Sequence, residues 1–157
     1  MQTNSAVDSS DAPGLSRARS RFGLLIARVY RQWRRQVDLS FKDLGLSDAT
    51  RTPLLVLYEQ GQPLRQKDLA DALYLDSSSL VRVLAQLRQA QLVDWACDPA
   101  DRRTKCIALT EKGRTTAGLI LAKSLEIERT LLAELSPGEQ QVTRAVLEKI
   151  SQRFAAL

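Results

Sequence analysis

Histidine is absent from this chain of 157 residues, and cysteine, glycine and aromatic residues are scarce. Without histidine there is no Ser-His-Asp or Cys-His nucleophile arrangement, no HExxH zinc site and no other histidine-ligated metal site. The two cysteines, Cys97 and Cys106, are too few for a disulfide framework or a four-thiolate zinc site. None of the seven glycines belongs to a glycine-rich phosphate loop. We therefore expect no enzymatic activity, no cofactor and no metal site.

Long apolar runs are also missing, and none approaches the roughly 18–20 residues that a membrane span requires. The first residues, MQTNSAVDSSDAPG, have neither the basic start nor the apolar stretch of a signal peptide. They predict a disordered tail over residues 1–15. We expect a cytoplasmic protein that makes no membrane contact.

What the chain does have is a basic charge balance, with 23 Lys and Arg against 18 Asp and Glu, for a net charge of +5. A basic surface favours polyanionic partners. The length is that of about one domain. Residues 16–45 predict a first helix with one apolar stripe. Arginines cover its other faces: Arg17, Arg19, Arg21, Arg28, Arg31, Arg34 and Arg35.

The middle of the chain predicts two further helices and then the helix most suited to contact a partner. Ser47 is a candidate N-cap for a helix that reaches Gly61, and Pro53 indicates either a late start or a kink. A short helix over Arg65–Leu73 follows. Asp76 and the three serines after it then predict the start of a helix from about Ser77 to Ala90.

The next stretch changes to the period of a β-hairpin, with strands over 92–97 and 105–109. Its loop, DPADRRT, has the composition of a turn. Thr110 begins another helix, and Ser136-Pro137-Gly138-Glu139 predicts a capping box for the last one. The predicted fold class is mainly α with a small two-stranded β wing, a winged helix-turn-helix with additional helices at both ends.

A helix-turn-helix followed by a wing is a DNA-reading arrangement, because an α-helix fits the major groove. We expect the hydroxyls of the first turn of the capped helix to contact DNA, helped by its positive N-terminus, and Arg82 to read a guanine. Two wing arginines are placed to reach the minor groove or the backbone. The predicted DNA-binding residues are Ser77, Ser78, Ser79, Arg82, Arg102 and Arg103. Each of these features also has a plain structural explanation, and only their order makes them specific.

The segment 46–113 resembles the MarR family of winged-helix transcriptional regulators, most of all its SlyA branch. The similar stretches are QKDLADAL, SSLVRVLAQL, QLVDW and DPADRRTKCIALTEKG. The resemblance implies a winged helix-turn-helix DNA-binding domain over 46–113 and a helical dimerisation region formed by 16–45 and 114–157. It also implies that Asp101 orients the wing arginine. One departure is Tyr74, because the turn of the motif usually holds a small residue; we expect a turn of different shape.

We also expect homodimerisation from the apolar stripes of the terminal helices, which one small winged helix cannot cover. The alternative is a monomer whose terminal helices fold back on its own core. Members of the resembled family often bind small aromatic acids, and the first helix offers cations and a ring for one. The predicted ligand-binding residues are Arg28, Arg31, Trp33 and Arg34.

The sequence thus predicts a homodimeric regulator that binds palindromic double-stranded DNA and is released by a small aromatic carboxylate. An architectural DNA binder or a protein-interaction module without an effector is the alternative. We expect Cys97 and Cys106 to be buried inert thiols or unpaired surface thiols. A redox pair that faces across the hairpin is the alternative.

Overall fold

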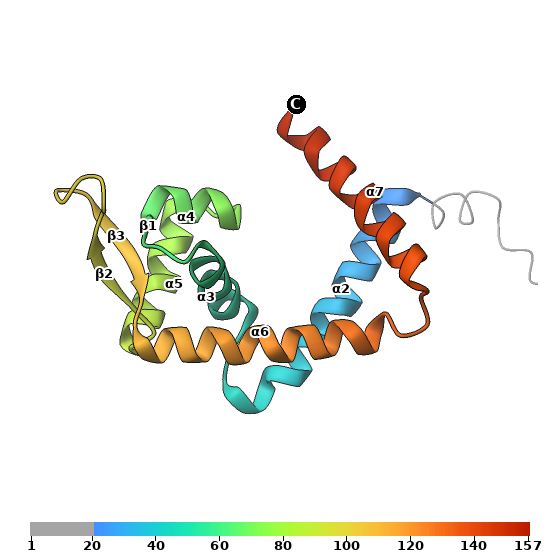
Figure 1. The fold of residues 1–157 in the computed structure, drawn as a ribbon, viewed down its shortest axis with the longest axis horizontal. Helices are drawn as coiled ribbons and strands as arrows, with labels where there is room; N and C mark the ends of the chain where they lie inside the picture. The colour runs from blue at the N-terminus through green and yellow to red at the C-terminus, as the bar shows by residue number, and fades with distance from the viewer. Residues whose placement is uncertain (1–20) are drawn as a thin grey trace, which may run out of the picture. The chain divides into compact units, whose positions relative to one another are not determined.

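The computed structural model describes residues 21–157 (Figure 1). They fall into two compact units divided between Gly45 and Leu46. The predicted tail, together with Arg17 and Arg19, lies outside the described residues. The elements in chain order are α2 (Phe22–Phe41), the 3₁₀ turn η1 (Lys42–Leu44), α3 (Asp48–Gln60), β1 (Leu64–Arg65), α4 (Gln66–Leu73), α5 (Ser77–Gln89), β2 (Val93–Cys97), β3 (Lys105–Leu109), α6 (Glu111–Leu131) and α7 (Pro137–Ala155). The mainly helical fold class is confirmed.

The first unit is the amphipathic helix α2 followed by η1. Gly45 ends it with a φ of 64°, a left-handed conformation that glycine adopts without steric cost. This agrees with the predicted end of the helix near Gly45. The apolar side of α2 is open within this unit, since Phe22 and Val29 are about half exposed.

The second unit begins with α3, whose course settles the question raised by Pro53. The helix starts at Asp48, with Ser47 in the N-cap position, and continues unbroken through Pro53 to Gln60. Proline at this sixth position removes one intrahelical donor, and its ring is buried instead. The helix therefore does not start late, and it tolerates the proline in its interior.

A three-stranded antiparallel sheet in the order β1-β3-β2 completes the winged helix. The hairpin was predicted, whereas β1 was not. In the register, Ala96 lies opposite Cys106 and Cys97 lies opposite Lys105. Neighbouring residues of a strand point to opposite faces, so the two cysteines lie on different faces of the hairpin. The register therefore contradicts the alternative of a redox pair facing across the hairpin, whereas the buried Cys106 and the exposed Cys97 agree with the expected unpaired thiols.

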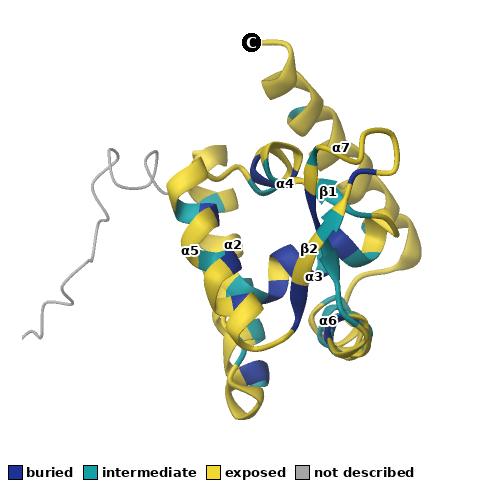
Figure 2. Cartoon of the chain, turned by 90° about the vertical axis from the view of Figure 1, so that its left-hand side faces the viewer, coloured by how far each residue is buried: buried dark blue, intermediate teal, exposed yellow. Residues whose placement is uncertain are grey.

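The core of the winged helix lies between α3, α4, α5, α6 and the sheet (Figure 2). It is built mainly from fully buried aliphatic side chains: Leu54, Leu69, Leu80, Leu84, Leu87, Ile107, Ala117 and Ile120. On α5, three of these recur at the spacing of one helix face, which leaves the opposite face free.

Helix α6 joins this core through a close backbone contact at its first turn. Thr110 caps the helix by accepting the N–H of Gly113 at 2.9 Å, and it donates its own N–H to the Leu92 carbonyl at 3.1 Å. Lys112 Nζ donates to the Ala90 carbonyl at 2.9 Å. The start of α6 is therefore fastened to the segment that links α5 to β2.

The last helix, α7, has the predicted capping box between Ser136 and Glu139. None of its residues is buried, although Val142 and Phe154 are large and apolar (Figure 2). None of the helices within residues 21–157 combines the length and the apolarity needed to cross a bilayer.

Candidate nucleic-acid interface

The turn between α4 and α5 keeps the left-handed residue that helix-turn-helix geometry uses, and that residue is Tyr74. Its φ and ψ are 54° and 37°, and the following Leu75 N–H donates to the Ala70 carbonyl at 3.0 Å. The expectation of a differently shaped turn is therefore wrong. A tyrosine is costly in this conformation because its Cβ crowds the backbone. The side chain is 94% exposed, so the core does not compensate that cost.

The N-terminus of α5 is capped by the carboxylate of Asp76. Its Oδ1 accepts the N–H of Ser79 at 2.9 Å, and its Oδ2 accepts the Ser79 hydroxyl at 2.8 Å. The Ser78 hydroxyl also donates to Oδ1. These hydrogen bonds, the one from the Ser78 hydroxyl above all, hold the pKa of Asp76 well below its usual range.

This cap changes the roles expected for the three serines. The hydroxyl protons of Ser78 and Ser79 are engaged by Asp76, and the carboxylate offsets the positive end of the helix. Ser77 is exposed and its hydroxyl makes no hydrogen bond within residues 21–157. Of the three, only Ser77 can donate to a phosphate without opening the cap.

The outer face of α5 is available to a partner along its length. Arg82 is exposed and forms no ion pair within the part of the chain that the structure describes. Val81 beside it is 54% exposed, and its apolar side chain suits a thymine methyl group. Sequence reasoning placed Val81 on this face without assigning it a role. Gln89 lies further along the same face.

The wing loop is folded around Asp101, which was expected to orient a wing arginine and bonds the backbone of Arg103. The carboxylate accepts the backbone N–H of Arg103 at 3.0 Å and the Thr104 hydroxyl at 3.2 Å. It therefore shapes the backbone of the loop, while the guanidinium groups of Arg102 and Arg103 project from it. Both arginines are exposed and have no ion-pair partner among residues 21–157.

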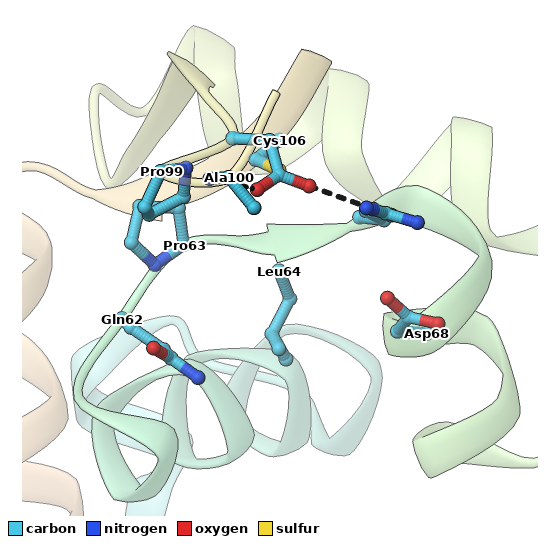
Figure 3. Close-up of a pocket in the computed structure, with 9 residues that line it drawn as sticks. Gln62, Pro63, Leu64, Asp68, Pro99, Ala100 and Cys106 are labelled. Atoms are coloured by element: carbon cyan, nitrogen blue, oxygen red, sulfur yellow. Dashed lines mark hydrogen bonds and ion pairs between the residues drawn. The ribbon is translucent and has the colours of Figure 1, made fainter. Parts of the chain in front are cut away.

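The root of the wing holds an ion pair that the sequence did not reveal. Arg65 Nε donates to Asp98 Oδ2 at 2.7 Å, and Ala100 N donates to Oδ1 at 2.8 Å (Figure 3). These bonds, the one from Ala100 first, lower the pKa of Asp98. Asp98 is 8% exposed and borders a cleft of about 330 Å³, at whose wall burial raises the pKa of the Cys106 thiol.

A second cluster fastens the other side of the hairpin to the end of α5. The Trp95 ring lies 5.5 Å from the Arg88 guanidinium and 6.0 Å from Lys105 Nζ. Arg88 also pairs with Asp94 at 3.6 Å. These cations stack on the ring, so they are less available to a partner than those at the wing tip.

The four predicted ligand-binding residues all lie on α2, in the first unit. The three arginines are exposed and Trp33 is partly buried; Arg34 pairs with Asp38 at 3.9 Å. A helix turns by about 100° per residue, which places Trp33 about 160° around the axis from Arg31. The ring and that guanidinium therefore lie on opposite sides of the helix.

Comparisons with known proteins agree with this geometry. Residues 52–113 match the family model described as a winged helix DNA-binding domain. Three similar solved structures cover most of the chain. The transcriptional regulator PA3341 is 30% identical over 87% of this chain and all of its own, with a TM-score of 0.81. A MarR-family regulator from Rhodococcus sp. RHA1 is 25% identical over 90% of this chain and 97% of its own, with a TM-score of 0.74. CouR from Rhodococcus jostii RHA1, bound to p-coumaroyl-CoA, is 28% identical over 83% of this chain and 92% of its own, with a TM-score of 0.74.

These relatives do not test the likeness to the SlyA branch, which stays a prediction. The family itself is shown by the regulator that is 30% identical along its whole length and by the winged-helix match over the DNA-binding motif. The chain belongs to the MarR family of winged-helix, DNA-binding transcriptional regulators.

Proposed function

We propose that the protein is a cytoplasmic homodimer that regulates transcription by binding palindromic operators, and that it acts by binding and not by catalysis. The observation that carries the proposal is the outer surface of the winged helix. Arg82, Arg102 and Arg103 are exposed on α5 and at the wing tip, with no ion-pair partner within residues 21–157, and they lie where this fold makes major-groove and backbone contacts.

The terminal helices support a dimer. Helix α7 has no buried residue in the single chain, and Val142 and Phe154 are 64% and 71% exposed. On α6, Leu119 is 64% exposed. Apolar surface of this extent on helices favours association with a second copy. A two-fold dimer also presents two copies of α5 to an inverted repeat.

Selection of duplexes from a random library tests the proposal, with binding then measured by fluorescence anisotropy. We expect enrichment of an inverted repeat whose half-sites lie about one helical turn, roughly 34–36 Å, apart. Arg103→Ala should reduce the slope of log affinity against log salt by about one. Arg129→Ala is the matched control, because it removes an exposed arginine from the far end of α6. Binding without an enriched sequence would instead favour an architectural role, and no binding would favour a protein-interaction module.

We further propose that an aromatic carboxylate acts as the effector. CouR is bound to an aromatic acyl thioester, and α2 offers Arg28 and Arg31 as exposed cations within about 60° of each other on the helix. Trp33 lies on another side of the helix. It therefore contacts either a different part of the ligand from the two arginines or no ligand at all. Titration of the protein–operator complex with benzoates and cinnamates tests this. Release that is lost in Arg31→Ala supports the site, and no release by any of them contradicts it.

A further inference from the structure

One side-chain bond at the root of the wing loop leads directly to the helix-turn-helix motif. Asp98 is the first residue after β2, where the loop begins. Its N–H donates to the Thr104 carbonyl at 3.0 Å, which closes the loop. Its carboxylate then bonds in two directions, to Ala100 within the loop and to Arg65 outside it (Figure 3).

The position of Arg65 allows this second bond to link two parts of the winged helix. It is the last residue of β1 and also the N-cap residue of α4, the first helix of the helix-turn-helix. Its neighbour in the sheet is Cys106 of β3. A side-chain bond from Arg65 to Asp98 therefore joins the start of α4 to the root of the wing loop.

The surroundings of the ion pair indicate that it orients the loop more than it stabilises the fold. The Arg65 side chain is 53% exposed on the open cleft, so its attraction to Asp98 is partly screened by solvent. The Asp98 side chain is only 10% exposed, and each of its oxygens has a fixed partner. Such a bond restricts the orientation of the wing loop but adds little to the free energy of unfolding.

We propose that Arg65 and Asp98 are positioning residues for DNA binding: their ion pair holds the wing at the angle at which Arg102 and Arg103 reach the DNA while α5 occupies the major groove. The inference rests on the proposed function of the winged helix. A positioning role and the net charge predict opposite effects of Asp98→Asn on DNA affinity. Asp98→Asn removes a negative charge and should strengthen attraction to DNA, whereas loss of the positioning should weaken binding.

The test is a set of double-mutant cycles on the full chain with its selected operator. We expect Asp98→Asn to weaken binding about fivefold to tenfold, as when one arginine–phosphate contact is lost. In a protein that already carries Arg102→Ala and Arg103→Ala, the same change should cost less than about twofold, because the wing no longer contributes. In an Arg82→Ala protein the full loss should remain.

Arg65→Met provides the second variant, because it breaks the same ion pair from the other side and leaves Asp98 in place. It should show the same dependence on the wing arginines, and thermal melting of both variants shows that they are folded at the temperature of the binding assay. Equal losses with and without the wing arginines would overturn the proposal, as would operator binding by Asp98→Asn at or above the parent affinity. A parent protein that selects no operator would instead refute the proposed function, and the positioning role with it.

Discussion

Gly113, in the first turn of α6, is the residue whose replacement by alanine should be most informative about the fold. A Cβ built on Gly113 would lie 1.8 Å from the Leu92 carbonyl oxygen and 2.8 Å from its carbon. Real Cβ atoms do not approach another atom closer than 3.0 Å, so the two backbones must separate by more than an ångström. No flexible side chain is present there to absorb the shift.

The cost follows from the bonds that fasten this contact. Thr110 N–H to the Leu92 carbonyl, at 3.1 Å, and Lys112 Nζ to the Ala90 carbonyl, at 2.9 Å, would both stretch beyond hydrogen-bond distance. Each is worth about 1 kcal/mol, and overpacking costs about 1–3 kcal/mol more. Alanine returns about 0.5–1 kcal/mol through its helix propensity. We expect Gly113→Ala to lower the free energy of unfolding by about 2–4 kcal/mol.

Gly118→Ala is the matched control, because it lies in the same helix and its Cβ would meet only the Tyr58 hydroxyl at 3.8 Å. That variant should be more stable by about 0.5–1 kcal/mol. Urea unfolding followed by circular dichroism measures both, at one protein concentration because association affects stability. A Gly113→Ala protein as stable as the parent, with Gly118→Ala stabilised as expected, would refute the reasoning.

Three further predictions concern the helix-turn-helix motif. Arg82→Ala should relax the preference at one base position of each half-site by about 1–3 kcal/mol; equal losses on all duplexes in a competition assay would make Arg82 a phosphate contact. Tyr74→Gly should stabilise the fold by up to about 1 kcal/mol, the left-handed strain less the entropy of glycine; a lower urea midpoint than that of the parent would contradict this. Asp76→Ala should destabilise the fold at neutral pH, because the lowered pKa of Asp76 means that its charged form is the stabilising one. The difference should shrink as the pH falls below 3.8, the ordinary value for this carboxyl, and a difference independent of pH in acid titrations would remove the charge from the explanation.

The long elements of the winged helix could be predicted because their signals are local. The start of α5 at Ser77 follows from the cap residue Asp76, and the hairpin follows from alternating apolar residues around a turn. The strand β1 has only two residues and no period of its own. It exists because Leu64 pairs with Ile107, far along the chain, and the Arg65–Asp98 ion pair depends on that same pairing.

Side-chain roles were predicted less well than elements, for two different reasons. Serines at a helix start serve equally as caps or as contacts to a partner, and only the hydrogen bonds to Asp76 decide between the two. Which faces the two cysteines occupy depends on the hairpin register, which residue counting alone did not supply. The separation of Trp33 from Arg31 around α2, in contrast, was already implied by the helical repeat.

The carboxylate at the start of α5 has a consequence for the solution conditions that the protein tolerates. Helix N-termini commonly bind free phosphate or sulfate, which then competes with nucleic acid for the same backbone donors. Here Asp76 already occupies the Ser79 donor with a covalently attached anion. Replacing chloride by sulfate or phosphate at equal ionic strength should therefore change operator affinity less in the parent protein than in Asp76→Ala, where the Ser79 donor is free. The carboxylate of Asp76 therefore takes the place of a bound ion at this donor and reduces the competition between free anions and DNA at the start of α5.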